Sequence, residues 1–133
     1  MIDIYRSMFV ADRERAREAA FSLKSACVEK GFKDRRTEDL VAAASEILSN
    51  ALKYANGCAV TISFFESQMG LGVVFSAVDH GKGIADIDAA LAPNKSTSGT
   101  LGLGLYAAKR LVDVFDISSS ASGTRVSLTK WRG

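Results

Sequence analysis

Residues 46–55 read EILSNALKYA, and this stretch decides the fold because an apolar stripe and a polar stripe run side by side along it. Apolar residues recur at helical spacing from Leu40 to Ala55, which predicts one amphipathic helix. Thr37 provides an N-cap for this helix, and Asn56-Gly57 provides a stop signal. Such a helix must bury its apolar stripe against another layer of the molecule.

The polar stripe of this helix consists of Glu46, Asn50 and Lys53, at positions i, i+4 and i+7. At about 100° per residue the three side chains lie within roughly 60° of one another. A carboxylate, an amide and an ammonium therefore share one face, which the small residues Ala42, Ala43 and Ser49 flank. The alternative interpretation is a solvated face with a Glu–Lys attraction of about 0.2–0.5 kcal/mol.

The flanking sequence predicts short strands and further helices. Alternating apolar residues indicate a strand over residues 2–10, and Asp12 can cap a helix that ends at Gly31. Downstream, two alternating segments around the turn 68–70 predict a hairpin. A third helix follows residue 104, with one face formed by Leu105, Ala108, Leu111, Val112 and Phe115. Residues 117–121, the turn Ser122-Gly123 and residues 124–131 predict a last hairpin.

The expected element order is strand, helix, helix, strand, strand, loop, helix, strand, strand. Because tight turns join the strand pairs, the sheet should be mostly antiparallel, with the helices covering one face. The fold class is therefore an α/β (α+β) two-layer sandwich and not a doubly wound Rossmann sheet. We find no repeat or linker, so we expect a single domain over residues 1–133.

Composition excludes several classes of protein. The 133 residues are 47% hydrophobic and 24% charged, with a net charge of +2, which is far from the footprint of a nucleic-acid binder. No signal-peptide layout and no membrane-length apolar run are present, so we expect a cytoplasmic protein without a membrane partner. Cys27, Cys58 and the single His80 do not form a zinc motif, and the cysteines are interpreted as buried, inert thiols.

Residues 79–84, with the sequence DHGKGI, follow a predicted strand. Asp79 can accept a hydrogen bond from an exocyclic amine at the point where the strand ends. Gly81 and Gly83 would let the backbone turn sharply and approach a flat ring. Taken alone, the segment is also compatible with an ordinary glycine-rich turn, and His80 is interpreted as a turn residue.

Residues 96–105 read STSGTLGLGL and lead into the third helix. Glycines at a helix start expose backbone N–H groups to an anion, which suits a triphosphate. The segment lacks the layout of a P-loop and of a dinucleotide fingerprint. A flexible linker before a helix is the alternative interpretation.

In this order the three motifs resemble the N, G1 and G2 boxes of GHKL ATPases: residues 46–55, 79–84 and 102–105. The resemblance covers nearly the whole chain. Within the superfamily, the chain resembles the small bacterial serine/threonine kinases and anti-sigma factors of partner-switching modules. Residues 96–115 and 128–131 are similar to the RsbT branch, whereas the RsbW and SpoIIAB anti-sigma branch usually departs from this pattern after the G2 glycines.

The resemblance implies a Bergerat ATP-binding fold with ATP and Mg²⁺ as cofactors. Asp79 would accept from the adenine amino group, and Asn50 would bind Mg²⁺ through its amide oxygen. Glu46 would orient and deprotonate an incoming serine or threonine hydroxyl. Residues 91–101 would form an ATP lid, Lys53 would either approach the phosphates or stay solvated, and no arginine is placed as a finger. The implied nucleotide contacts are Asn50, Lys53, Asp79, Gly81, Gly83, Ile84, Lys95, Thr100, Leu101, Gly102, Leu103, Gly104 and Leu105.

The resemblance also implies protein partners. RsbT-like kinases are associated with a serine or threonine on a STAS-domain regulator and with binding and activating a PP2C-type phosphatase. The first alternative is an anti-sigma factor with kinase activity that holds a sigma factor. The second is a nucleotide-sensing module without transfer activity, and the presence of Glu46 argues against it because binding alone needs no base.

Overall fold

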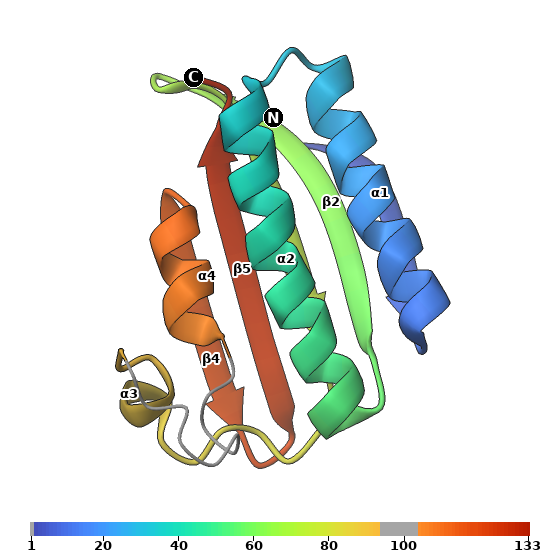
Figure 1. Cartoon of the computed structure of the whole chain (residues 1–133), viewed down its shortest axis with the longest axis vertical. Helices are drawn as coiled ribbons and strands as arrows, with labels where there is room; N and C mark the ends of the chain where they lie inside the picture. The colour runs from blue at the N-terminus through green and yellow to red at the C-terminus, as the bar shows by residue number, and fades with distance from the viewer. Residues whose placement is uncertain (1, 94–103) are drawn as a thin grey trace.

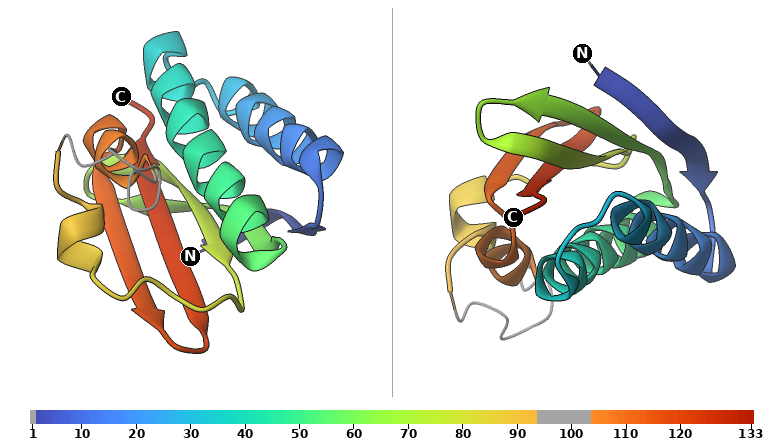
Figure 2. Two further views of the ribbon diagram at one scale, coloured as in Figure 1. Left: turned by 60° about the horizontal axis from the view of Figure 1, so that its bottom comes forward. Right: turned by 90° about the horizontal axis from the view of Figure 1, so that it is seen from above.

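A five-stranded antiparallel sheet with helices on one face forms the molecule (Figures 1 and 2). The computed structural model describes residues 2–93 and 104–133. The strand order is β1-β2-β3-β5-β4, and every neighbouring pair is antiparallel. This confirms the predicted two-layer sandwich. The elements are β1 (Ile2–Val10), α1 (Arg13–Glu29), α2 (Asp34–Ala55), β2 (Cys58–Ser67), β3 (Gly70–Val78), α3 (Ile87–Ala90), α4 (Leu105–Leu111), β4 (Val114–Ser120) and β5 (Gly123–Trp131).

The core lies between the sheet and the helices α1, α2 and α4. Alternate residues of the central strands face the helices, and the apolar stripe of α2 packs onto them. Each fully buried aliphatic or phenylalanine side chain contributes about 1.5–3 kcal/mol relative to its exposure to water. This packing holds α2 across the middle of the sheet (Figure 1). Its central members are Leu40, Ala44, Leu48, Val60, Ile62, Val73, Phe75 and Leu128.

Helix α1 begins as its sequence predicts, and an ion pair links it to β1. The side chain of Asp12 accepts a hydrogen bond from the backbone N–H of Arg15, at 2.8 Å. Glu18 forms ion pairs with Arg6 on β1 and with Arg15. The hydrogen bonds from these two guanidinium groups hold the pKa of the Glu18 carboxyl below its ordinary value. The pair with Arg6 ties the outer helix to the edge strand, whereas the pair with Arg15 lies within α1.

The prediction that Thr37 is the N-cap of the second helix is wrong. Helix α2 begins one turn earlier, at Asp34, with Lys33 as its N-cap. Thr37 lies inside the first turns, only 3% exposed, and its hydroxyl has no hydrogen-bond partner among the described residues. The reason is tertiary: Phe32 is buried against Phe64, which anchors the connection close to the sheet and starts the helix early.

The prediction that Val112 and Phe115 continue the face of the third helix is also wrong. Helix α4 ends at Leu111, and Val112 already has extended backbone. Strand β4 begins at Val114, where it pairs with Thr129 of β5. Pairing with a neighbouring strand therefore overrides the local helical spacing, and β-branched valines suit this outcome.

A further short helix, α3, was not predicted. Its N-cap Asp86 accepts from the backbone N–H of Ala89 at 3.0 Å. With this addition, the observed element order matches the expected one. No helix in residues 2–93 or 104–133 is both long enough and apolar enough to cross a membrane.

Candidate functional site

A cavity of about 430 Å³ opens beside the C-terminal half of α2, between this helix and the ends of β3 and β5. Helix α2 and the loop after β3 contribute most of its walls. The cavity therefore brings together two sequence motifs that lie about a quarter of the chain apart. Of the residues that the sequence predicts as nucleotide contacts, the cavity is lined by Asn50, Lys53, Asp79, Gly81, Gly83, Ile84 and Leu105.

Asp79 lines this cavity and is held in one orientation. Its Oδ1 accepts from the backbone N–H groups of Gly81 at 2.9 Å and Thr124 at 3.1 Å. Its own N–H donates to the Thr124 carbonyl at 2.9 Å, which adds a further link between β3 and β5. Both hydrogen bonds that described residues make to the carboxylate use Oδ1. Oδ2 is therefore the oxygen that remains for a ligand.

The loop after Asp79 is fixed to the β4–β5 hairpin. Gly83 has a positive φ of 83°, and a Cβ at this position would overlap the backbone carbonyl of Ser120. Only glycine combines this conformation with so close an approach. The next N–H, that of Ile84, donates to the Ser119 hydroxyl at 2.6 Å. The loop therefore keeps a defined shape at the cavity wall.

Glu46 lies against the start of α4. Gly104, the N-cap of α4, has a positive φ of 71°, and a Cβ there would overlap the Glu46 carboxylate. Glu46 itself is exposed and does not line the cavity. Among the described residues it takes part in no ion pair, and its role as a base stays a prediction.

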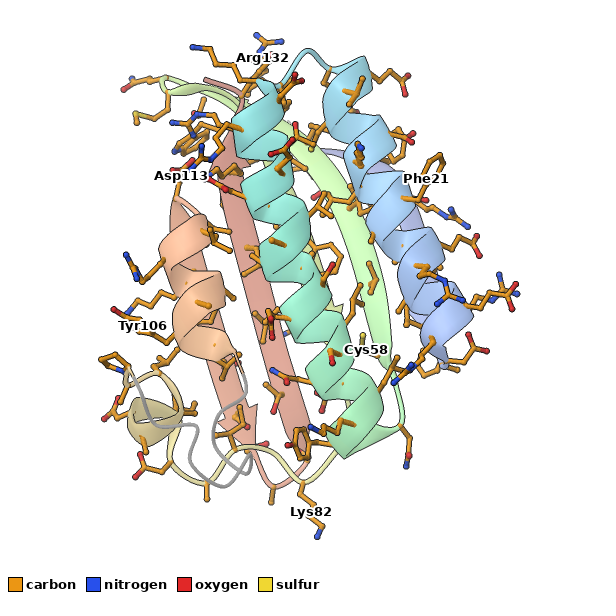
Figure 3. The ribbon with its side chains drawn as sticks, in the orientation of Figure 1. Phe21, Cys58, Lys82, Tyr106, Asp113 and Arg132 are labelled. Atoms are coloured by element: carbon orange, nitrogen blue, oxygen red, sulfur yellow. The ribbon has the colours of Figure 1, made fainter. Side chains whose placement is uncertain are left out.

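Lys53 lies on the exposed side of α2 and lines the cavity, with its ammonium 5.6 Å from the centre of the Tyr54 ring. Lys82 also lines the cavity, but its side chain points away from the molecule at its lower end (Figure 3). His80 is exposed in the turn, in agreement with its interpretation as a turn residue.

Some predicted contacts lie outside the described residues. These are Lys95, Thr100, Leu101, Gly102 and Leu103, together with most of the proposed lid over residues 91–101. Their roles stay predictions.

Two residues that the sequence analysis missed help to build the site. Thr124 lines the cavity and donates its N–H to Asp79, and its hydroxyl lies 2.8 Å from that of Ser119. The only available signal was the expected last hairpin. The hairpin alone does not place Thr124 near Asp79. The pairing of β3 with β5 does, because it sets Val78 opposite Arg125 and so brings the next residue of β3's end, Asp79, beside Thr124.

Asn50, the predicted ligand of Mg²⁺, is one of the residues that line the cavity. No group of three or more His, Cys, Asp or Glu side chains gathers into a metal site in residues 2–93 and 104–133. Mg²⁺ is commonly held by one or two protein oxygens plus phosphate oxygens and water. A side-chain amide at the cavity wall is therefore compatible with Mg²⁺ that arrives with a nucleotide.

The two cysteines are not candidates for chemistry. Both are buried, and Cys58 lies in the interior at the start of β2 (Figure 3). Burial raises the pKa of Cys27 to about 12. Burial, with a smaller effect of the Asp79 charge, raises the pKa of Cys58 to about 11. This agrees with their interpretation as inert thiols, because the thiolate is the reactive form.

Comparison with known proteins identifies relatives. A family model described as a histidine kinase-like ATPase domain matches residues 9–130. The serine/threonine-protein kinase RsbT of Bacillus subtilis (strain 168) is 34% identical over 123 residues, which covers 92% of this chain and 87% of that protein.

Two solved structures share the fold. The structure of the RsbU and RsbW domains of a Mycobacterium tuberculosis protein matches with a TM-score of 0.64 and 22% identity. It covers 95% of this chain, which spans only 32% of that longer chain. The SiaB–SiaC complex of Pseudomonas aeruginosa matches with a TM-score of 0.59 and 18% identity, over 96% of this chain and 90% of that one.

Proposed function

The chain belongs to the histidine kinase-like ATPase domain family, and we propose that it is a protein kinase that transfers the γ-phosphate of ATP to a serine or threonine. The observation that carries the proposal is the position of two carboxylates relative to the cavity. Asp79 lines it in a fixed orientation, and Glu46 lies outside its lining, against Gly104, where α4 begins. The identity of 34% with a serine/threonine-protein kinase supports the same function.

In the proposed complex, Asp79 recognises adenine. Oδ1 is occupied by two backbone donors, so Oδ2 accepts from the exocyclic amino group. The fixed loop around Gly83 and Ile84 places flat backbone beside the ring, and Leu105 provides apolar contact from the other wall. These groups bind and orient the nucleotide without taking part in bond making.

Asn50 would hold Mg²⁺ through its amide oxygen, and the ion would neutralise charge on the phosphates when it is bound. Lys53, on the same exposed side of α2, can add a positive charge near the triphosphate. Phosphoryl transfer depends mainly on positioning and charge neutralisation, so these contributions come before any proton transfer.

Glu46 is the proposed base. It lies one helical turn before Asn50, and one turn is about 5 Å along the axis. From this position its carboxylate accepts the proton of the acceptor hydroxyl as the oxygen attacks the γ-phosphorus. The bond from phosphorus to the bridging oxygen breaks, and ADP leaves with that oxygen. General base catalysis of this kind contributes about 10²–10⁴-fold.

We propose a STAS-domain protein as the acceptor and a PP2C-type phosphatase as a second partner that the chain binds and activates. Both proposals rest on the resemblance of residues 96–115 and 128–131 to the RsbT branch. In this proposal the chain binds the STAS-domain protein and the phosphatase at different times.

A transfer assay tests the proposal. The protein is incubated with Mg²⁺ and γ-labelled ATP, and STAS-domain proteins of the same organism are added one at a time. We expect label on one of them, and none with Glu46→Gln, although this variant still binds ATP. Absence of label on every STAS-domain protein, with ATP bound, would overturn the kinase assignment and direct the search to sigma factors.

A further inference from the structure

A second groove lies on the other side of α2, between the C-terminal half of this helix and the first half of α1. Alanines of α1 and leucines of α2, among them Ala16, Ala20 and Leu48, form its floor. It encloses about 560 Å³, and it shares one residue, Lys53, with the nucleotide cavity. The two hollows therefore flank the same part of α2 and meet at this lysine.

The charge of the groove has one sign. Arg13 and Arg17, one turn apart on α1, line it together with Lys53, and no carboxylate is among the described residues that line it. None of the three cations forms an ion pair with a residue in the described part of the chain. This contrasts with Arg15 on the same helix, which is paired with Glu18 at 2.8 Å.

The ridge of α2 between the two hollows carries small side chains. Ser45 and Ser49 line the groove, and they directly precede Glu46 and Asn50 in the sequence. Both serines and the neighbouring Ala42 are exposed. The backbone of a bound protein can therefore approach this ridge closely and reach from the groove across to Glu46.

We propose that this groove binds an acidic segment of the acceptor protein and so delivers its serine or threonine to Glu46. The proposal rests on the kinase function proposed above. Unpaired cations beside an apolar floor match a segment in which carboxylates alternate with apolar residues. Complementary charge of this kind mainly sets the specificity of docking and its rate. The groove thus determines which protein is phosphorylated, whereas the cavity determines which nucleotide is used.

The first experiment requires no transfer activity. An oligoglutamate peptide is titrated at low salt into the ¹⁵N-labelled protein, and amide shifts are followed. We expect shifts at Ala16, Ala20, Ser45 and Ser49, and we expect Arg17→Glu to weaken binding at least about tenfold while Arg17→Lys retains it. Arg35→Glu is the matched control, because Arg35 has a side chain that is 86% exposed at the far end of α2.

The second experiment uses the STAS-domain protein that the transfer assay labels. Arg17→Glu should raise the KM for this protein at least about tenfold and leave the KM for ATP and the kcat within about twofold. Arg35→Glu should change none of the three. Equal effects of the two reversals, peptide shifts outside the groove, or preference for a DNA oligonucleotide over oligoglutamate would each overturn the proposal. If the kinase function is right but the docking site is wrong, label is transferred and oligoglutamate does not shift the groove. If the docking site is right but the kinase function is wrong, oligoglutamate shifts the groove and no label is transferred.

Discussion

The two halves of helix α2 differ in how their polar side chains are used. In the N-terminal half, two charged side chains form ion pairs with other elements: Arg36 with Asp113 at 3.0 Å, and Asp39 with Lys130 at 3.8 Å. In the C-terminal half, Glu46 faces a glycine backbone and is in no ion pair with a described residue. The first half fastens the helix to β5 and to the connection before β4, whereas the second half places Asn50 and Lys53 along the nucleotide cavity.

This contrast implies that substitutions in the two halves should affect different properties. Changes around the N-terminal half should lower the free energy of unfolding and leave nucleotide chemistry intact. Changes around the C-terminal half should alter binding or transfer with little effect on folding. The following predictions test that separation.

The largest expected effect is on transfer, from Gly104→Ala. The added methyl group would overlap the Glu46 carboxylate and displace it, and a misplacement of about 1 Å can cost about 100-fold in rate. Gly31→Ala is the matched control: Gly31 also has a positive φ, 81°, but no atom lies near its Cβ position. Both variants incur the left-handed backbone penalty of about 1–2 kcal/mol. If their kcat values are equally reduced, contact between Gly104 and Glu46 does not control transfer.

Lys130→Met should produce the largest effect on stability. Lys130 is 7% exposed, and its ammonium donates to the Leu111 carbonyl at the end of α4, at 2.6 Å. Methionine keeps the volume but removes the donor and the partner of Asp39. We expect the free energy of unfolding in urea to fall by about 2 kcal/mol, with ATP affinity unchanged.

Arg35→Ala is its control, because the exposed pair of Arg35 with Asp39 contributes about 0–1 kcal/mol. If Lys130→Met loses ATP binding under conditions in which the variant is fully folded, the N-terminal half of α2 affects nucleotide binding as well as stability. The proposed difference between the two halves would then be wrong.

Asp79→Asn should weaken ATP binding at least tenfold, about 1.4 kcal/mol or more. The amide removes the charge and can present an NH₂ group where the adenine amine needs an acceptor. Calorimetric titration with ATP measures the change. An unchanged affinity would show that Asp79 does not contact the base, and the proposed orientation of the nucleotide would be wrong.

The sequence predicts most of the fold, since local signals are strong where one face of a strand or helix is buried. Alternation gives β1, and Asp12 marks the start of α1. Long-range effects could not be predicted in the same way. Phe32 packs against Phe64 and shifts the start of α2, and pairing with Thr129 converts Val114 from a helical to a strand residue.

The site divides in the same way. Asn50 and Asp79 could be identified because each belongs to a local motif, and the structure places both in one cavity. Thr124 reaches Asp79 across 45 positions of sequence, through the pairing of β3 with β5. The groove beside α1 is formed by residues of two helices, α1 and α2. Residue spacing within one helix does not indicate how that helix packs against the other, so the sequence alone does not predict the groove.

The smallest expected effect, that of Thr37→Val, has a sign that distinguishes the sequence-based and structural descriptions of α2. If Thr37 were the N-cap, loss of its hydroxyl would cost about 1 kcal/mol. In the structure the hydroxyl is buried without a hydrogen-bond partner in residues 2–93 and 104–133, and valine has a similar shape and helix propensity. Removing the unpaired hydroxyl should therefore raise the free energy of unfolding by about 1 kcal/mol.

Thr37→Ser is the control for this prediction, because serine retains the hydroxyl and deletes the methyl group. It should be less stable than the unsubstituted protein, whereas a true N-cap would tolerate it. Urea unfolding of both variants measures the two signs. A stabilised valine variant and a destabilised serine variant would together establish that the N-terminal half of α2 is held by packing, with its helix starting at Asp34. A destabilised valine variant with an unaffected serine variant would instead indicate that Thr37 is the N-cap. The helix would then begin at Thr37, and the turn that holds Arg36 next to Asp113 would not be helical.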